Sequence, residues 1–409
     1  MQNNQICYFT YGSNMLAERL MERCPSAKFI CSAYVCGYEL RFSKRSEDCS
    51  GKATIVENAR NNNKLYGAVF EIDKSELSKL DKAEGIGYER RDNFIVVRAD
   101  KNEEIKVTTY FAKSGATGEH LKPYNWYKQL VLWGAIKAKL PSSYLAKLVA
   151  IEAERDCDEE RNKKALNLLK NVDNRGFPEG NWGMRIADQY TVADWEAMKT
   201  ILVLGKPDNW EDAFKVFFKK RIETRYFEPI RLLQKHGENK GEGFAIVALQ
   251  CSLIEFLSSV ADIENCTCKK PELLKTKRNC CNKKTSADEC QTCHLNIINN
   301  SKRFTDFLHK ENGLFKGELS SSNKARSFYD DVRCTLLHDA RTKGKWKILA
   351  NSDNNKIINW KGENSEKILY RNDLQKAFEQ YVDAYGKELE KCPKLQEAFI
   401  RKFNNLCEE

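Results

Sequence analysis

The chain has 409 residues and a net charge of +10, from 68 basic and 58 acidic side chains, a balance that permits nucleic-acid binding without requiring it. Hydrophobic residues make up 41%, with only 8 Pro and 21 Gly, which excludes a disordered or collagen-like chain and predicts two or three packed domains. No apolar run approaches the roughly 18 residues that a membrane-spanning helix requires, and residues 1–5 are polar and unlike a secretory signal, so a cytoplasmic protein without membrane contact is expected.

Residues 1–155 contain short β-branched and aromatic runs, which are typical of strands. These runs are residues 6–10, 53–56, 65–72, 94–97 and 107–111. Helices are expected from Asp73, with Glu76 at the spacing of a capping box, and from about 124 to 139. This order predicts an α+β domain, a small β-barrel with peripheral helices.

Two segments of this domain carry residues suited to catalysis. The first follows a strand and opens a helix, and consists of Tyr11, Gly12, Ser13, Asn14 and Met15. Its backbone N–H groups are suited to holding a carboxylate or an oxyanion, although Gly and Ser also serve purely structural turns. The second is Glu84, at a helix end among glycines, where a carboxylate can act as general acid and base or be a solvated surface group.

The order and spacing of several motifs strengthen the functional interpretation of both segments. After the Tyr11 to Met15 string come residues 37–42, 51–55, 67–70, 84–85 and 127–134. The ordered set resembles the gamma-glutamylcyclotransferase family across residues 5–150. That resemblance implies a small β-barrel and a reaction in which a γ-glutamyl amine cyclises to 5-oxoproline and releases an amine.

The resemblance also implies roles for individual residues. Glu84 would move the proton, the Tyr11 to Met15 loop would grip the small γ-glutamyl substrate through its N–H groups, and Tyr127 would close the pocket. No cofactor is expected for catalysis. The alternative is a binding module, in which the pocket only senses a γ-glutamyl-like ligand and controls the rest of the chain.

Residues 156–207 are polar and mixed and are expected to connect this domain to a second one, residues 208–409. There, apolar residues recur at three- and four-residue steps, and residues 243–260 are nearly all apolar, as in a buried central helix. Further helical patterns occur at 322–340, 372–389 and 393–406. The second domain is therefore predicted to be an all-α bundle of four or five helices.

One helix of this bundle carries Arg333 and His338, five residues apart. His can take the proton of a ribose 2′-hydroxyl while Arg steadies the phosphate, but a packed His and a surface Arg form the same string. In its helical context the region resembles HEPN-type domains, many of which are metal-independent ribonucleases that act as dimers. Cys334 departs from the polar residue often found after the Arg.

The two resemblances together suggest a bacterial toxin or antiviral defence effector that forms a homodimer or higher homo-oligomer and acts on RNA. The alternative for the bundle is a dimerisation or RNA-binding module without nuclease activity.

A Cys-rich insertion at about 264–296 interrupts the bundle. Its residue types suit a structural zinc ion, with the candidate ligands Cys266, Cys268, Cys290 and Cys293. Residues 269–284 include seven basic and one acidic side chain, which could contact RNA phosphates. The irregular spacing leaves a solvated loop with reduced thiols as the alternative.

Overall fold

The computed structural model describes residues 4–58, 63–169, 182–237, 240–267, 273–274, 289–290, 293, 295–310, 313–360 and 366–408. The chain divides into two compact units, Met1–Arg185 with Gln189–Leu202, and Ile186–Asp188 with Val203–Glu409. The segment expected to connect two domains, 156–207, supplies two helices of the first unit, α5 (Glu159–Asn167) and α6 (Val192–Lys199).

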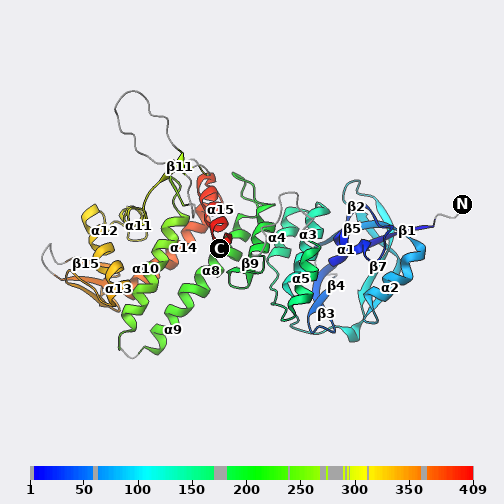
Figure 1. The fold of residues 1–409 in the computed structure, drawn as a ribbon, viewed down its shortest axis with the longest axis horizontal. Helices are drawn as coiled ribbons and strands as arrows, with labels where there is room; N and C mark the ends of the chain where they lie inside the picture. Colours follow the sequence, from blue (N-terminus) through cyan, green and yellow to red (C-terminus); the bar gives the residue numbers. More distant parts are fainter. Residues whose placement is uncertain are drawn as a thin grey trace, which may run out of the picture. The chain divides into compact units, whose positions relative to one another are not determined.

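The first unit contains the expected small β-barrel, drawn in blue to cyan in Figure 1. Five strands close it in the order β1, β5, β2, β6, β7. Their bounds are β1 (Gln5–Thr10), β2 (Lys28–Cys36), β5 (Lys64–Asp73), β6 (Tyr88–Arg98) and β7 (Glu104–Ala112). The barrel closes where Tyr8 of β1 pairs in parallel with Thr108 of β7, so β1 and the segment that follows it lie beside the middle of β7.

A separate antiparallel hairpin consists of β3 (Tyr38–Arg45) and β4 (Gly51–Glu57). The five predicted strand runs all fall inside observed strands, whereas β2 and β3 were not predicted. Both missed strands mix small, polar and charged residues among their apolar ones, which weakens the alternation on which strand prediction depends.

Short helices surround the barrel. They are η1 (Ser13–Met15), α1 (Ala17–Met21), η2 (Lys74–Glu76), α2 (Leu77–Glu84), η3 (Ser114–Ala116), α3 (Asn125–Lys137) and α4 (Ser142–Val149). The predicted start at Asp73 is confirmed, because its side chain accepts a hydrogen bond from Ser75 N. The predicted capping box is wrong, since the Glu76 carboxylate accepts hydrogen bonds from Ser26 instead.

The second unit has a helical core that begins with one continuous helical run. The run comprises α7 (Trp210–Ala213), η4 (Phe214–Lys219), α8 (Lys220–Ile222), η5 (Glu223–Phe227) and α9 (Glu228–His236), of which η4 and η5 are π-helical. The other helices are α10 (Glu242–Val260), α11 (Asn300–His309), α12 (Ser322–Phe328), the π-helical η6 (Tyr329–Cys334), α13 (Thr335–Asp339), α14 (Arg371–Leu389) and α15 (Pro393–Cys407).

Aromatic side chains join three of these helical segments. Phe218 stacks on Tyr385 of α14 with ring centroids 4.7 Å apart, and its centroid lies 6.2 Å from that of Phe399 of α15. Because each buried aromatic ring removes about 150–250 Å² from water, this cluster is a major part of the unit's core.

Helix α10 corrects one expectation about long apolar runs. By length and composition its residues Glu242–Val260 are apolar enough to cross a membrane, but 61% of the relevant window is buried inside the protein. Its contacts are those of the expected central helix of the unit.

The second unit is mainly helical as predicted, but it is not all-α. A three-stranded sheet lies in this unit, in the order β14 (Trp346–Leu349), β16 (Lys367–Tyr370), β15 (Ile358–Trp360). Four two-residue strands occur near the Cys-rich insertion, β10 (Asn265–Cys266), β11 (Leu273–Leu274), β12 (Glu289–Cys290) and β13 (Asn296–Ile297). The remaining short strands of the chain are β8 (Arg185–Ala187) and β9 (Tyr190–Thr191). All are too short to produce a clear alternating pattern.

Candidate active site

Local sequence fixes the position of Glu84. It is the last residue of α2, and Gly85 ends the helix with a left-handed φ of 79° and an N–H that donates to Asp81 O at 3.0 Å. Glycine is the residue that adopts this conformation without steric cost. The chain therefore turns away directly after Glu84, and leaves the carboxylate at the helix end.

Glu84 and the loop after β1 meet in one pocket of the first unit. With its open mouth, the pocket has a volume of about 310 Å³. It is lined by Tyr8, Phe9, Thr10, Tyr11, Gly12, Ser13, Asn14, Ala53, Glu84, Tyr88, Thr109, Tyr110 and Tyr127. Of the residues that sequence analysis proposed for substrate binding in this domain, only Met15 is absent from the lining.

Two polar side chains hold one oxygen of the Glu84 carboxylate. Asn14 Nδ2 donates to Glu84 Oε1 at 2.7 Å, and Arg23 Nη1 lies 3.7 Å from the same oxygen. Arg23 Nη1 also donates to Asn14 Oδ1 at 2.7 Å, which fixes the amide orientation. Within the described part of the chain, Oε2 has no hydrogen-bond partner, so it remains available to a ligand.

Burial dominates the electrostatics of Glu84. Its side chain is only 14% exposed, and this loss of solvation raises its pKa above the usual range, against the opposing charge of Arg23 and the hydrogen bond from Asn14. A carboxylate with a raised pKa is a better proton acceptor and, once protonated, still a competent acid near neutral pH.

Backbone N–H groups of the loop after β1 also have no hydrogen-bond partner among the described contacts. The first hydrogen bond inside the loop is Met15 N to Gly12 O at 3.0 Å, and among the described contacts the N–H groups of Gly12, Ser13 and Asn14 have no acceptor. Preorganised N–H donors of this kind can bind a carboxylate or stabilise a developing oxyanion.

Met15 has a structural position instead. It is 2% exposed and lies against α3, where a Cβ added to Gly134 would come within 2.8 Å of the Met15 Cβ and 2.6 Å of its carbonyl carbon. Gly134 thus allows α3 to approach the loop closely, which explains why a glycine is needed at that helical position.

Tyrosine hydroxyls form much of the polar pocket wall. Tyr11 donates to Tyr110 O at 2.5 Å, and Tyr110 donates to Asp81 Oδ1 at 2.7 Å. The hydroxyls of Tyr8 and Tyr127 instead accept hydrogen bonds, from Asn14 Nδ2 at 3.1 Å and from Ala53 N at 3.2 Å. Burial raises the pKa of both groups, so each keeps a proton that it can donate to a ligand.

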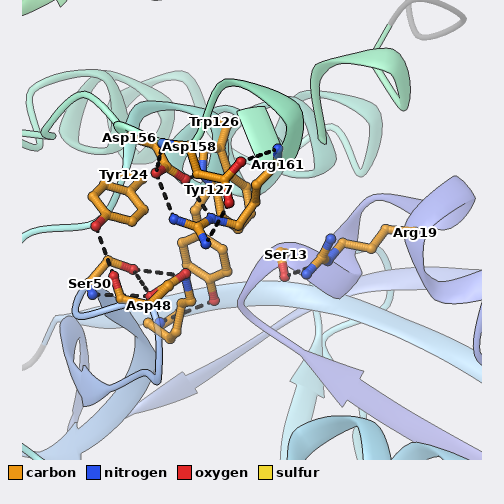
Figure 2. A network of polar contacts seen from close by, with 12 residues as sticks. Ser13, Arg19, Asp48, Ser50, Tyr124, Trp126, Tyr127, Asp156, Asp158 and Arg161 are labelled. Atoms are coloured by element: carbon orange, nitrogen blue, oxygen red, sulfur yellow. Dashed lines mark hydrogen bonds and ion pairs between the residues drawn. The ribbon is translucent and has the colours of Figure 1, made fainter. Parts of the chain in front are cut away.

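A second polar network surrounds Tyr127 (Figure 2). Lys52 Nζ donates to Asp48 Oδ2 at 2.6 Å and to Ser50 Oγ at 2.8 Å, and lies 4.6 and 4.8 Å from the ring centroids of Trp126 and Tyr127. Burial opposes ionisation of Asp48, but hydrogen bonds from Lys52 and Ser50 prevail and lower its pKa to about 2.

The same network reaches α5. Trp126 Nε1 donates to Asp156 Oδ2 at 2.8 Å, and Arg161 holds Asp156 with two hydrogen bonds of 2.6 and 2.7 Å. Residues 156–161 therefore support the helix that carries Tyr127.

In the second unit, Arg333 and His338 are not joined by any described contact. Arg333 is 19% exposed, donates to Glu255 Oε1 at 2.7 Å through Nε, and lies 5.4 Å from the Tyr329 ring centroid. Burial disfavours its charge, but the hydrogen bonds with Glu255 prevail and raise its pKa. His338 is exposed on α13. Arg333 Nη1 and the Cys334 Sγ are 3.9 Å apart.

The proposed zinc ligands fall largely outside the described residues. Cys268 is not described, and of Cys266 and Cys290 only the backbone is described, in β10 and β12. Cys293 is described as a half-buried free thiol. The zinc prediction is therefore untested.

Several pocket residues were missed in the sequence. Tyr8 and Tyr110 lie inside predicted strands, and Tyr88 lies four residues after Glu84. Their aromatic side chains were the only feature of the sequence that could have indicated a place in the pocket. Arg19 and Arg23 of the loop's surroundings carried no signal at all.

Comparison with known proteins bears on the same domain. A profile of the AIG2-like family matches residues 64–148. The gamma-glutamylcyclotransferase of Homo sapiens is 33% identical over 157 residues, which cover 36% of this chain and 78% of that protein. The enzyme of the same name from Mus musculus is 35% identical over 157 residues, with the same two coverages. A solved structure named gamma-glutamyl cyclotransferase is 30% identical, has a TM-score of 0.35, and covers 39% of this chain and 99% of that chain. Through its N-terminal domain, the chain thus belongs to the gamma-glutamylcyclotransferase family.

Proposed function

We propose that the N-terminal domain releases an amine from a γ-glutamyl compound by cyclising the glutamyl group to 5-oxoproline. The observation that carries this proposal is the Glu84 carboxylate, buried in a pocket with one oxygen held by Asn14 and the other unengaged among the described contacts. Membership of the gamma-glutamylcyclotransferase family supports the same activity.

The reaction needs one proton carrier and one site for developing negative charge. Glu84 takes a proton from the substrate α-amine, whose nitrogen attacks the γ-carbonyl carbon and forms the ring C–N bond. Negative charge develops on the carbonyl oxygen, where the N–H groups of the loop after β1 and the Tyr8 and Tyr127 hydroxyls can donate hydrogen bonds. The original amide C–N bond then breaks, and Glu84 returns the proton to the leaving amine.

Atoms and protons balance in these reaction steps without water or a redox group. Because no step uses a metal ion, we expect metal chelators to leave the rate unchanged. The test is incubation of the full-length protein with γ-L-glutamyl-L-alanine, followed by mass spectrometry. Release of 5-oxoproline and alanine supports the proposal. Binding of the dipeptide without product would favour the alternative function, a γ-glutamyl-ligand sensor.

We also propose that the second unit, in a homodimer or higher homo-oligomer, cleaves RNA without metal through Arg333 and His338. Support comes from the π-helical segment that carries Arg333, because π-helical turns occur frequently at functional sites. The exposed His338 on the next helical turn is accessible to a second subunit or to RNA. Such an activity would suit a cytoplasmic toxin or antiviral defence effector.

The RNA proposal has a direct test. Wild-type protein should sediment as a dimer or larger oligomer and cleave RNA in the presence of EDTA, while His338→Ala should be inactive and equally stable. A monomeric wild type, or an active His338→Ala variant, would contradict it, and a dimerisation or RNA-binding module would be the better description.

A further inference from the structure

We propose that Arg19 binds a carboxylate of the substrate, and so restricts the N-terminal site to γ-glutamyl compounds that carry a carboxylate beside the reacting amide. This inference depends on the proposed cyclisation and specifies its substrate class.

Arg19 lies on α1, and its guanidinium faces the pocket loop (Figure 2). Its Nε donates to Ser13 Oγ at 3.0 Å, and Ser13 lines the pocket next to Gly12 and near Tyr127. Arg19 therefore lies beside the pocket, one hydrogen bond away from a lining residue.

The carboxylates of Glu22 and Glu84 favour the charge of Arg19, but neither forms an ion pair with it. Among residues whose placement is described, no carboxylate forms an ion pair with Arg19, and its two terminal nitrogens have no hydrogen-bond partner. The side chain is half-buried, and burial together with the charge of Arg23 lowers its pKa. A partly desolvated cation without a directly paired anion is costly, and a bound carboxylate would reduce that cost.

The neighbouring cations are less suited to this role. Arg23 is engaged with Asn14 Oδ1 and Glu84 Oε1, and Lys44 lies over the Tyr88 ring at 5.1 Å. The contacts of Arg23 Nη1 hold that guanidinium at Asn14 and Glu84, whereas both terminal nitrogens of Arg19 have no partner among the described contacts and are coplanar, the arrangement that binds a carboxylate through two hydrogen bonds.

A γ-glutamyl dipeptide presents two carboxylates, one on the glutamyl half and one on the leaving amino acid. The experiment therefore uses three substrates: γ-L-glutamyl-L-alanine, its analogue with an α-carboxamide on the glutamyl half, and its analogue with alaninamide as the leaving half. For each substrate, kcat/KM is measured for wild type, Arg19→Met, Arg19→Lys and the control Arg98→Met. Arg98 lies in β6 and pairs with Asp100, outside the pocket lining.

We expect Arg19→Met to lower kcat/KM for the dipeptide by about 10- to 100-fold, the range for a hydrogen-bonded charged group. For the one analogue that lacks the recognised carboxylate, the ratio of wild type to variant should be near one, which identifies the carboxylate. Arg19→Lys should lie between wild type and Arg19→Met, and Arg98→Met should match wild type. An equal loss of kcat/KM with all three substrates, or no loss with any, would overturn the inference.

If the wild type releases no 5-oxoproline, the proposed function fails and binding decides the inference. Titrations of γ-L-glutamyl-L-alanine and of its two carboxamide analogues, followed by NMR on full-length protein, would then be compared. Arg19→Met should lose the wild-type preference for the carboxylate, whereas a preference equal to that of wild type, or no preference in wild type, would overturn the inference.

Discussion

Replacing Asp194 by Asn removes one charge from an ion pair with Lys128 of α3, the helix that carries Tyr127. Lys128 follows Tyr127 on α3, and its Nζ lies 2.8 Å from Asp194 Oδ1, with the two side chains 2% and 1% exposed. Lys128 also donates to Val149 O at 2.7 Å, and Asp194 also accepts from Gln129 Nε2 at 2.8 Å. The substitution keeps the side-chain size and leaves the ammonium buried without a counter-charge.

The expected loss in free energy of unfolding is about 3–5 kcal/mol, the range for removing one partner of a buried pair. With a urea m-value of about 2 kcal/mol/M, the midpoint of the first unit should fall by about 1.5–2.5 M. The matched control is Lys199→Met on the same helix α6, which breaks the more exposed Lys199–Glu196 pair and should cost less than about 1 kcal/mol.

The pH dependence separates the charge effect from lost packing. Burial lowers the pKa of Lys128 in the folded protein, and Asp194 opposes that shift; without Asp194 the folded-state pKa falls further below the unfolded value. The unfolded variant then binds more protons than the folded one, so its free energy of unfolding rises with pH. The deficit relative to wild type should shrink as pH rises from 7 toward 10, and a deficit below 1 kcal/mol, or one independent of pH, would refute the reasoning.

Three further outcomes follow from the site and the insertion. Because burial raises the pKa of Glu84, the acid limb of the pH profile of kcat should lie above the ordinary Glu pKa of about 4.3. Arg23→Met removes a cation that favours the carboxylate, so this variant should move the acid limb to higher pH. A limb that stays in place or moves to lower pH in Arg23→Met would contradict the assignment of Glu84. Gly134→Ala would bring a methyl group within 2.5 Å of Leu16 N, so it should lower both the thermal midpoint and kcat/KM, while Ala135→Gly on the same helix should leave the pocket loop in place and retain kcat/KM near wild type. If the Cys-rich insertion holds zinc, elemental analysis should find about one equivalent per chain and Cys290→Ser with Cys293→Ser should lose it, whereas metal-free protein of unchanged thermal stability would favour reduced thiols.

The predictable parts of the pocket are short segments in which a reactive side chain stands next to a residue that the backbone conformation requires. Glu84 stands before a glycine that ends its helix, and the loop Tyr11 to Met15 joins a strand to a helix, so both left a local pattern. The hydroxyls of Tyr8 and Tyr110 belong to β1 and β7, which meet only when the barrel closes. No local pattern in the sequence therefore indicates that these two hydroxyls lie in the same pocket.

Errors elsewhere have the same physical origin. Glu76 stands at capping-box spacing from Asp73, but its carboxylate accepts a hydrogen bond from Ser26, which is distant in sequence. In the second unit β14 pairs directly and in parallel with β16, although β15 lies between them in sequence. Strands of four residues also leave little periodicity. Arg19 of α1 and Arg23, two residues after that helix, contact Ser13 and Asn14 of the pocket loop only in the folded chain, so no local pattern marked them.

The most direct test of the central claim is the rate of 5-oxoproline release from γ-L-glutamyl-L-alanine by wild type and by Glu84→Gln, measured in H₂¹⁸O by mass spectrometry. Intramolecular cyclisation predicts unlabelled 5-oxoproline from wild type, no labelled glutamate, and release by Glu84→Gln that is at least about 100-fold slower in a protein of unchanged thermal midpoint. Labelled glutamate as the product, or an equal rate in Glu84→Gln, would contradict the assignment of Glu84 as the proton carrier of a cyclotransferase.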